Sequence, residues 1–173
     1  MKKLLFVTLI ALAASSAAFA QSESDELKAK MAVKEGEPAP GFTLKNTEGV
    51  DVSLSDFRGQ WVLLDCWGTW CKYCMEDMPS MKEAYELYHP LGLEIIGIDS
   101  NDKEEIWINT VNRLELPWVN VTNPDRRKEG VCGAYGIQGF PTKVLIDPEG
   151  NINLIYVGED PEFYGLLKER LQP

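Results

Sequence analysis

The sequence predicts an α/β fold in which helices flank both faces of a mixed central sheet. Short apolar segments of strand length alternate along the chain with longer segments of helical periodicity, a pattern typical of parallel strands joined by helices. The last two strands, at 142–147 and 152–157, are separated only by the turn Asp147, Pro148, Glu149, Gly150, so they should pair antiparallel. With 173 residues and 45% apolar content, one domain can bury its own core.

In the first half of the chain each expected element has a local reason. Residues 42–45 and 50–53 flank a turn-like segment and should form a hairpin. Residues 61–67 are almost continuously apolar, which predicts a buried central strand. The spacing predicts a helix over 72–88, because one apolar stripe recurs at intervals of three and four residues: Cys74, Met78, Met81, Tyr85 and Tyr88.

The second half continues the alternation. Asn101 or Asp102 can cap a helix, and Asp160 followed by Pro161 is a common helix start. In chain order we expect a strand at 93–98, a helix from 101 or 102 to about 115, a strand at 118–121, a helix at 124–135, the two strands of the C-terminal hairpin, and a final helix from 161.

The N-terminus has the features of a secretory signal peptide. Lys2 and Lys3 precede an apolar stretch at 4–12, and Ala18, Phe19, Ala20 form a small-x-small cleavage site. A transmembrane anchor is the alternative, but the apolar run is short. We expect residues 1–20 to be removed, 21–35 to form a polar leader and 36–173 a single domain. The mature protein would be soluble and periplasmic or secreted, with no membrane insertion.

Charge excludes some partners. The formal net charge is −10, and signal cleavage would remove two lysines. An acidic protein repels phosphate backbones and anionic lipid, so we expect no nucleic-acid partner. We expect the mature chain to be a monomer.

Cys71, Lys72, Tyr73 and Cys74 lie between the predicted strand at 61–67 and the first turn of the helix that follows. Free backbone N–H groups and the helix dipole at that position favour a thiolate, and Lys72 adds a cation, so Cys71 should be the more nucleophilic thiol. Cys74 is spaced to attack a mixed disulfide on Cys71. A zinc site needs four ligands, usually two Cys-x-x-Cys pairs or cysteines with histidines. This chain has only one Cys-x-x-Cys pair and one histidine, so no metal is expected. A structural disulfide closing so short a loop would restrain little of the unfolded chain.

These residues resemble a known family. "WGTWCKYC" at 67–74 and "GFPT" at 139–142, with a proline eight residues after Cys71, are similar to the thioredoxin superfamily, and more closely to its exported TlpA/ResA-like branch of thiol-disulfide oxidoreductases. The resemblance runs from about residue 36 to the C-terminus and includes "GEPAPGFTL" and "SLSDFRGQWVLLDCWGTWC". It implies a thioredoxin fold with an N-terminal hairpin, and the helix-strand unit at 102–121 resembles the insertion of this branch.

The resemblance also implies roles for individual residues. Cys71 would be the attacking thiol and Cys74 the resolving one, with no cofactor beyond their redox-active disulfide. Pro141 matches the family's cis-proline, which presents the backbone of Phe140 to a substrate. Asp65 matches the buried carboxylate beneath the second cysteine. In an apolar strand such a group would have a raised pKa and could take the proton of Cys74, although a satisfied buried aspartate without a catalytic role is the alternative.

Other positions are expected around the active site. Asp77 lies where this branch often carries a glutamate, although a solvated helix face would explain it too. Tyr73 stands where many relatives have proline, so the reduction potential cannot be transferred from them. The residues expected to contact a substrate are Trp70, Lys72, Tyr73, Phe140 and Thr142.

Two further cysteines form a separate question. Cys66 follows Asp65 on the predicted strand, so its side chain should point to the opposite face of the sheet, toward the helix that contains Cys132. We therefore consider a second disulfide or redox-active pair between Cys66 and Cys132. The alternative is two buried free thiols that act as small apolar residues.

The predicted function is a thiol-disulfide oxidoreductase that reduces protein disulfides, with protein thiols or disulfides as substrates and an electron donor as a second partner. A disulfide oxidant or isomerase is one alternative. A thiol peroxidase is another, disfavoured because no peroxidatic Thr/Ser-x-x-Cys with the usual preceding proline is present. A thioredoxin-fold binding module without turnover is the non-enzymatic alternative.

Overall fold

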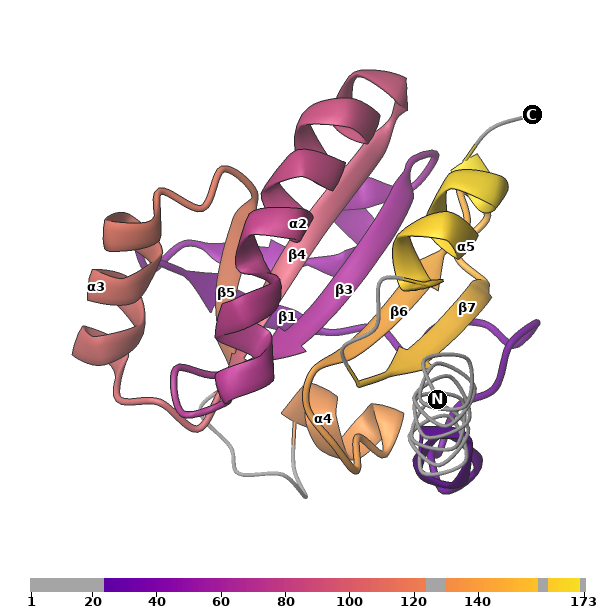
Figure 1. The fold of residues 1–173 in the computed structure, drawn as a ribbon, viewed down its shortest axis with the longest axis horizontal. Coiled ribbons are helices and arrows are strands. Elements are labelled where there is room, and N and C mark those ends of the chain that lie inside the picture. Colours follow the sequence, from indigo (N-terminus) through magenta and orange to yellow (C-terminus); the bar gives the residue numbers. More distant parts are fainter. Residues whose placement is uncertain (1–23, 124–129, 159–161, 172–173) are drawn as a thin grey trace, which may run out of the picture.

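A seven-stranded mixed sheet forms the centre of the protein (Figure 1). The structure, a computed structural model, describes residues 24–123, 130–158 and 162–171. The strand order is β2-β1-β5-β4-β3-β6-β7, and β3, β4 and β5 run parallel to one another while the outer pairs are antiparallel. The strands are β1 (Thr43–Asn46), β2 (Asp51–Ser53), β3 (Trp61–Trp67), β4 (Leu93–Ser100), β5 (Val119–Asn123), β6 (Thr142–Ile146) and β7 (Ile152–Val157), and the α-helices are α2 (Lys72–Tyr88), α3 (Glu104–Leu114), α4 (Gly130–Tyr135) and α5 (Glu162–Leu171).

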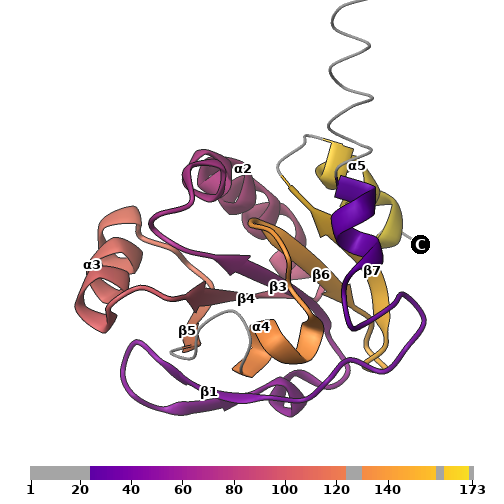
Figure 2. The ribbon, with the colours of Figure 1, turned by 90° about the horizontal axis from the view of Figure 1, so that it is seen from below.

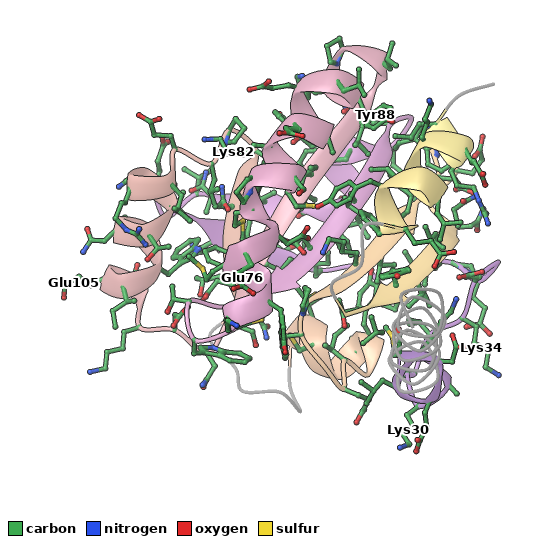
Figure 3. All side chains as sticks on the ribbon, in the orientation of Figure 1. Lys30, Lys34, Glu76, Lys82, Tyr88 and Glu105 are labelled. Atoms are coloured by element: carbon green, nitrogen blue, oxygen red, sulfur yellow. A yellow bond between two sulfur atoms is a disulfide. The ribbon has the colours of Figure 1, made fainter. Side chains whose placement is uncertain are left out.

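Helices cover both faces of the sheet, as Figure 2 shows from a second direction. Side chains from α2, α3 and α5 share one core cluster with one face, and side chains from α4 share a second cluster with the other. On the first face, Lys82 joins two helices, because its ammonium on α2 donates to the carbonyl of Leu114 at the end of α3, 3.0 Å away (Figure 3). The predicted fold class is confirmed.

Alternation along β3 decides which residues reach the active-site face. Leu63 and Trp67 belong to the cluster beneath α2, whereas Leu64 and Cys66 belong to the cluster beneath α4. Successive strand side chains point to opposite faces, so Asp65 lies on the α2 face. The prediction that Asp65 and Cys66 serve opposite faces is confirmed.

The predicted elements match the observed ones closely, with one error in capping. The strands at 61–67 and 152–157 and the helix at 72–88 have the predicted bounds, and α2 continues past Pro79. Neither Asn101 nor Asp102 caps α3, whose N-cap is Lys103. The Asp102 carboxylate instead accepts hydrogen bonds from the backbone N–H and hydroxyl of Thr69, each at 2.7 Å. The predicted cap at Asp160 and the predicted helical start at 124–129 lie outside the described residues.

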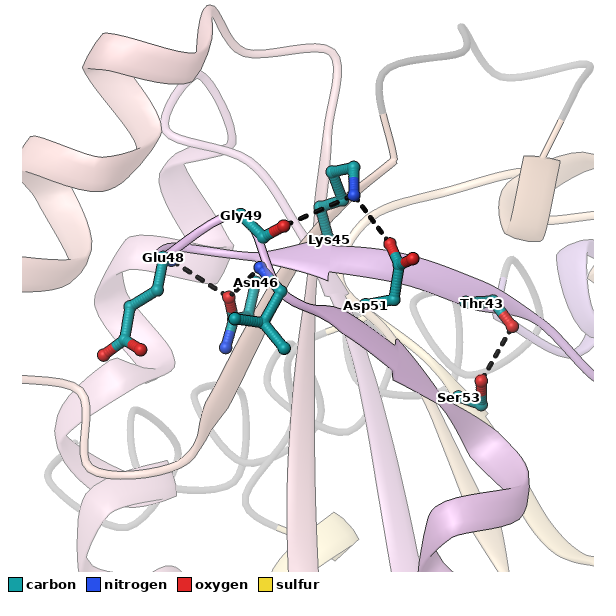
Figure 4. Close-up of polar contacts among 8 residues, drawn as sticks. Thr43, Lys45, Asn46, Glu48, Gly49, Asp51 and Ser53 are labelled. Carbon is teal, nitrogen blue, oxygen red and sulfur yellow. Dashed lines mark hydrogen bonds and ion pairs between the residues drawn. The ribbon is translucent and has the colours of Figure 1, made fainter.

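The hairpin of β1 and β2 is held by polar side chains (Figure 4). The Asn46 side-chain oxygen accepts from the backbone N–H groups of Glu48 and Val50, at 3.0 and 2.9 Å, and so closes the turn. Across the strands, the Lys45 ammonium lies 2.8 Å from the Asp51 carboxylate. The sheet is therefore extended beyond β5 by a hairpin whose turn is specified locally.

The described part of the predicted polar leader packs on the domain. Residues 24–29 are helical, and Met31 and Val33 are buried against the α4 face. The backbone N–H of Ala32 donates to Tyr135 O at 3.1 Å, and that of Ile155 donates to the Glu35 carboxylate at 3.0 Å. The predicted signal peptide lies outside the described residues. Within those residues, none of the helices is both long and apolar enough to cross a membrane.

Neighbouring side chains lie so close to Gly97 on β4 that a larger residue at this position should destabilise the fold. A methyl group would lie 2.8 Å from Asn120 Oδ1, 2.9 Å from Trp118 Nε1 and 3.2 Å from Trp67 Nε1, all three buried. We expect Gly97→Ala to lower the free energy of unfolding by about 1–3 kcal/mol through overpacking. Gly165→Ala in α5 is the control, because that site is open and alanine should stabilise the helix by up to ~1 kcal/mol. Urea unfolding measures both, and equal effects would contradict the prediction.

Candidate active site

The two cysteines of the Cys-x-x-Cys segment form a disulfide at the N-terminus of α2. Cys71 and Cys74 are bonded with their Cα atoms 5.3 Å apart. Cys71 is the N-cap, and its sulfur accepts a hydrogen bond from the backbone N–H of Cys74 at 3.1 Å. Since helix N–H groups favour negative charge, a Cys71 thiolate would be stabilised here. Cys71 is also the more accessible of the two, 6% exposed against 2% for Cys74.

Exposed aromatic and cationic side chains surround the disulfide. Trp70 is 43% exposed and Tyr73 56% exposed, and Lys72 lies on the open side of the first turn of α2. The Trp70 ring packs edge-on against Phe140, with ring centroids 5.0 Å apart, and its indole N–H donates to Ser100 O at 2.9 Å. The structure therefore brings four of the five predicted substrate-contacting residues to one region of the surface.

The loop before β6 follows the prediction in part. The Phe140–Pro141 peptide bond is cis, as predicted. Thr142 is fully buried, and its hydroxyl donates to Gly139 O at 2.8 Å. The Thr142 side chain is therefore turned into its own loop, and its predicted contact with a substrate stays a prediction.

Asp65 is a buried carboxylate on the α2 face of the sheet. It is 2% exposed, and within the described part of the chain its Oδ1 has no hydrogen-bond partner. The pKa of Asp65 is raised to about 6. Burial is the largest cause; the positive charge of Lys143 lowers the pKa in part, and the negative charge of Asp77 raises it. A carboxyl with such a pKa is ionised at neutral pH and basic enough to accept a proton.

Asp77 belongs to a buried polar cluster. Its Oδ2 lies 2.6 Å from Lys143 Nζ, and its Oδ1 accepts from the Tyr164 hydroxyl at 2.6 Å. Asp77 is buried, so the solvated helix face considered for it is excluded. Sequence reasoning missed Lys143 and Tyr164. Strand alternation could have indicated Lys143, because it lies two positions before Leu145 in a predicted strand and so shares the buried face with that leucine.

Cys66 and Cys132 lie on the opposite face of the sheet from the active-site disulfide. Both are buried in the cluster beneath α4, and neither is in a disulfide. A hydrogen bond with Cys132, and then burial, raise the pKa of the Cys66 thiol well above its usual value. The structure therefore shows two hydrogen-bonded buried thiols and no disulfide between them, and a redox-active pair of Cys66 and Cys132 stays a prediction. Among the described residues, no group of three or more histidine, cysteine or acidic side chains is arranged to hold a metal ion.

Asp99 and Asp102 form a second acidic pair, which is hydrogen-bonded to the active-site loop at Thr69. Asp99 is fully buried at the C-terminal end of β4, and burial, a hydrogen bond with Asp102 and the charge of Asp102 raise the pKa of Asp99 to about 8. Asp102 in turn binds the backbone of Thr69, two residues before Cys71. At neutral pH Asp99 is therefore mainly protonated, and its hydrogen bond with Asp102 connects β4 to the active-site loop, because Asp102 also accepts from the backbone N–H and hydroxyl of Thr69.

Stability should depend on pH through Asp99. Its pKa is about 8 in the folded protein and about 4 in an unfolded chain, so the folded state binds the extra proton between these values. The stabilisation is fully present below pH ~4 and is lost as pH rises toward 8. In Asp99→Asn the decrease between pH 5 and 8.5 should be smaller by on the order of 2 kcal/mol, because the amide keeps the hydrogen bond without titrating. Urea unfolding across pH tests this, with exposed Asp51→Asn as control, and parallel pH curves for all three proteins would refute it.

Comparisons with known proteins agree with this geometry. Residues 36–155 match the AhpC/TSA family. The thiol-disulfide oxidoreductase ResA of Bacillus thuringiensis (strain Al Hakam) is 35% identical over 144 residues, covering 82% of this chain and 80% of that protein. ResA of Geobacillus thermodenitrificans (strain NG80-2) is 37% identical over 129 residues, covering 75% and 72%.

A solved structure shares the fold. The crystal structure of the thioredoxin domain of a thiol-disulfide oxidoreductase from Bacteroides vulgatus is 30% identical, with a TM-score of 0.74, and the match covers 82% of this chain and all of that domain. The thioredoxin fold, the Cys-x-x-Cys disulfide at a helix N-terminus and the similarity to ResA all indicate a thiol-disulfide oxidoreductase. The chain therefore belongs to the AhpC/TSA family and is a thiol-disulfide oxidoreductase of the ResA-like kind.

Proposed function

We propose that this oxidoreductase works as a reductant of protein disulfides. The observation that carries the proposal is the position of the disulfide, with Cys71 at the N-cap of α2 and more exposed than Cys74. The helix N-terminus stabilises the thiolate of the cysteine that a client disulfide can reach, which assigns attack to Cys71 and resolution to Cys74.

The reaction proceeds in two exchanges. The Cys71 thiolate attacks one sulfur of a client disulfide, the client bond breaks, and the other client sulfur leaves as a thiolate. Cys74 then transfers its proton to Asp65 and attacks the Cys71 sulfur of the mixed disulfide, releasing the second client sulfur. The client gains two electrons and the Cys71–Cys74 disulfide forms, so a dithiol donor must reduce it before the next cycle.

The surface beside the disulfide suits an extended peptide. We assign the backbone of Phe140, next to the cis-proline, to pairing with a client segment, and the exposed rings of Trp70 and Tyr73 to apolar contacts with it. Lys72 favours clients with an acidic group near the disulfide.

We further propose that the protein acts outside the cytoplasm after loss of residues 1–20, as a monomer composed of the leader at 21–35 and the domain at 36–173. The basic, apolar and small-residue segments at the N-terminus support export. An acidic surface supports a role without nucleic acid.

The reduction potential of the Cys71–Cys74 couple tests the direction of electron flow. The mature chain, residues 21–173, would be equilibrated in dithiothreitol and glutathione buffers and its thiols quantified. A potential near or below that of thioredoxin, about −270 mV, supports a reductase. A potential near that of strong oxidants, about −120 mV, would reassign the protein to disulfide donation.

A further inference from the structure

A buried lysine lies between two carboxylates behind the active-site helix. Lys143 on β6 is 2% exposed, and its Nζ is 2.6 Å from Asp77 Oδ2 and 3.8 Å from Asp65 Oδ1. The strand register pairs Lys143 directly with Asp65 on β3, while Asp77 comes from α2. One positive charge therefore serves a carboxylate of the sheet and a carboxylate of the helix that carries Cys74.

Packing does not require a charge at this position. Leu145, which points to the same face two residues later, is an ordinary core side chain. Burying an ion pair costs several kcal/mol in desolvation, and well-packed apolar residues of similar volume often replace such pairs without loss of stability. The charge on Lys143 is thus poorly explained by stability alone.

Every element around Lys143 contributes a group that faces it. Asp65 comes from β3, Asp77 from α2, the Phe163 ring from α5 with its centroid 5.3 Å from Lys143 Nζ, and Tyr156 from the paired position on β7. The Tyr164 hydroxyl donates to Asp77 Oδ1 and Lys143 contacts Oδ2, so both oxygens of Asp77 are engaged. Asp77 holds Lys143 close to itself and leaves Asp65 at the longer distance.

We propose that Lys143 is a positioning residue for the resolving step, in which Lys143 and Asp77 act with opposite sign to set how readily Asp65 takes the proton of Cys74. The inference rests on the proposed function. In that step the proton moves from the Cys74 thiol to the Asp65 carboxylate, the Cys74 thiolate forms the bond to Cys71, and the client thiolate leaves. No other reactant is needed.

The signs follow from the charges. Burial raises the pKa of Asp65, Lys143 lowers it by stabilising the carboxylate, and Asp77 raises it by repulsion. Resolution needs ionised Asp65, so its rate should rise with pH through the pKa of that carboxyl. Removing Lys143 should move this rise to higher pH, and removing the charge of Asp77 should move it to lower pH.

The experiment follows the resolving step directly. Reduced mature protein would be mixed with one equivalent of Ellman's reagent in a stopped-flow instrument between pH 4.5 and 9. The first release of thionitrobenzoate reports attack by Cys71, and the second reports resolution by Cys74. We expect the pH midpoint of the second rate to move up by about one pH unit in Lys143→Met and down by about one unit in Asp77→Asn. Carboxyl carbon NMR of Asp65 should show the same two shifts.

The double variant separates charge from structure. In Lys143→Met/Asp77→Asn the opposite contributions should cancel, so the midpoint should return to within a few tenths of a unit of the original. Lys168→Met, which removes an exposed lysine of α5, should leave the midpoint unchanged. If Lys143→Met fails to fold, Asp77→Asn and the double variant still decide.

Midpoints that do not move in the folded single variants, or that move in the same direction, would overturn the inference. Failure of the proposed function looks different. In that case the Cys71–Cys74 couple would have the potential of a strong oxidant, or the unmodified protein would release no second equivalent of thionitrobenzoate at any pH, whereas a wrong assignment of Lys143 leaves the reductase potential and that release intact.

Discussion

Replacement of Cys71 by serine is expected to abolish the reduction of insulin by dithiothreitol that the unmodified protein catalyses. Cys71 is the more exposed residue of the pair, 6% against 2% for Cys74, and it lies at the helix N-terminus, so we expect no other described thiol to replace it as nucleophile. We expect the catalysed rate to fall by at least about a thousandfold. Turbidity of the precipitating insulin B chain measures the rate.

Cys74→Ser should fail differently. Its Cys71 can still attack, but the mixed disulfide has no resolving thiol, so a Cys71-linked client adduct should accumulate and be visible by intact-mass spectrometry. Cys132→Ala is the matched control for loss of one sulfur, because this cysteine is buried on the other face of the sheet and is not in a disulfide. Equal activity of the unmodified protein and Cys71→Ser would favour the binding module, and loss of activity in folded Cys132→Ala would revive the second redox pair.

The second large effect is expected at Asp65. Asp65→Asn keeps the shape of the side chain but cannot accept the Cys74 proton, so the resolving rate at pH 7 should fall about a hundredfold, while the attack of Cys71 should change much less. The rise of the resolving rate with a midpoint near pH 6, where the pKa of this buried carboxyl lies, should disappear. Stopped-flow release of thionitrobenzoate separates the two steps.

The contrary result is also informative. A resolving rate that stays within twofold of the original in a correctly folded Asp65→Asn protein would favour the alternative, a buried aspartate that serves only structure. Far-ultraviolet circular dichroism and urea unfolding would show that the variant is folded. The contribution of Asp65 to the free energy of unfolding should be fully present below pH ~4 and should be lost as pH rises through 6, because its pKa is raised in the folded state.

Some of the active site was predictable because its causes are local. The helix at 72–88 follows from its apolar stripe, and the position of Cys71 at the N-terminus of that helix follows from the adjoining strand. The opposite orientation of Asp65 and Cys66 follows from strand alternation alone. The cis bond before Pro141 was implied by resemblance to a family and not by any local pattern.

Other features depended on contacts between distant segments. Asp102 was expected to cap α3, but the loop at Thr69, 33 positions away in sequence, takes its carboxylate instead. Thr142 was expected to contact a substrate, and its hydroxyl donates inward to Gly139 O. Asp77 was open to two interpretations until the partners on β6 and α5 were placed beside it.

The sequence by itself determined the α/β class and the pair Cys71 and Cys74, and it placed the proposed attacking cysteine, Cys71, at a helix N-terminus, because these features depend on hydrophobic period and on groups within one turn of a helix. Only the tertiary structure decided that Lys143 stands between Asp65 and Asp77, that Asp99 is hydrogen-bonded to Asp102, and that Cys66 and Cys132 lie together behind the sheet. The physical reason is register: a side chain's charge partners are set by which strands pair and at which residue, and an error of one position moves every partner to the other face.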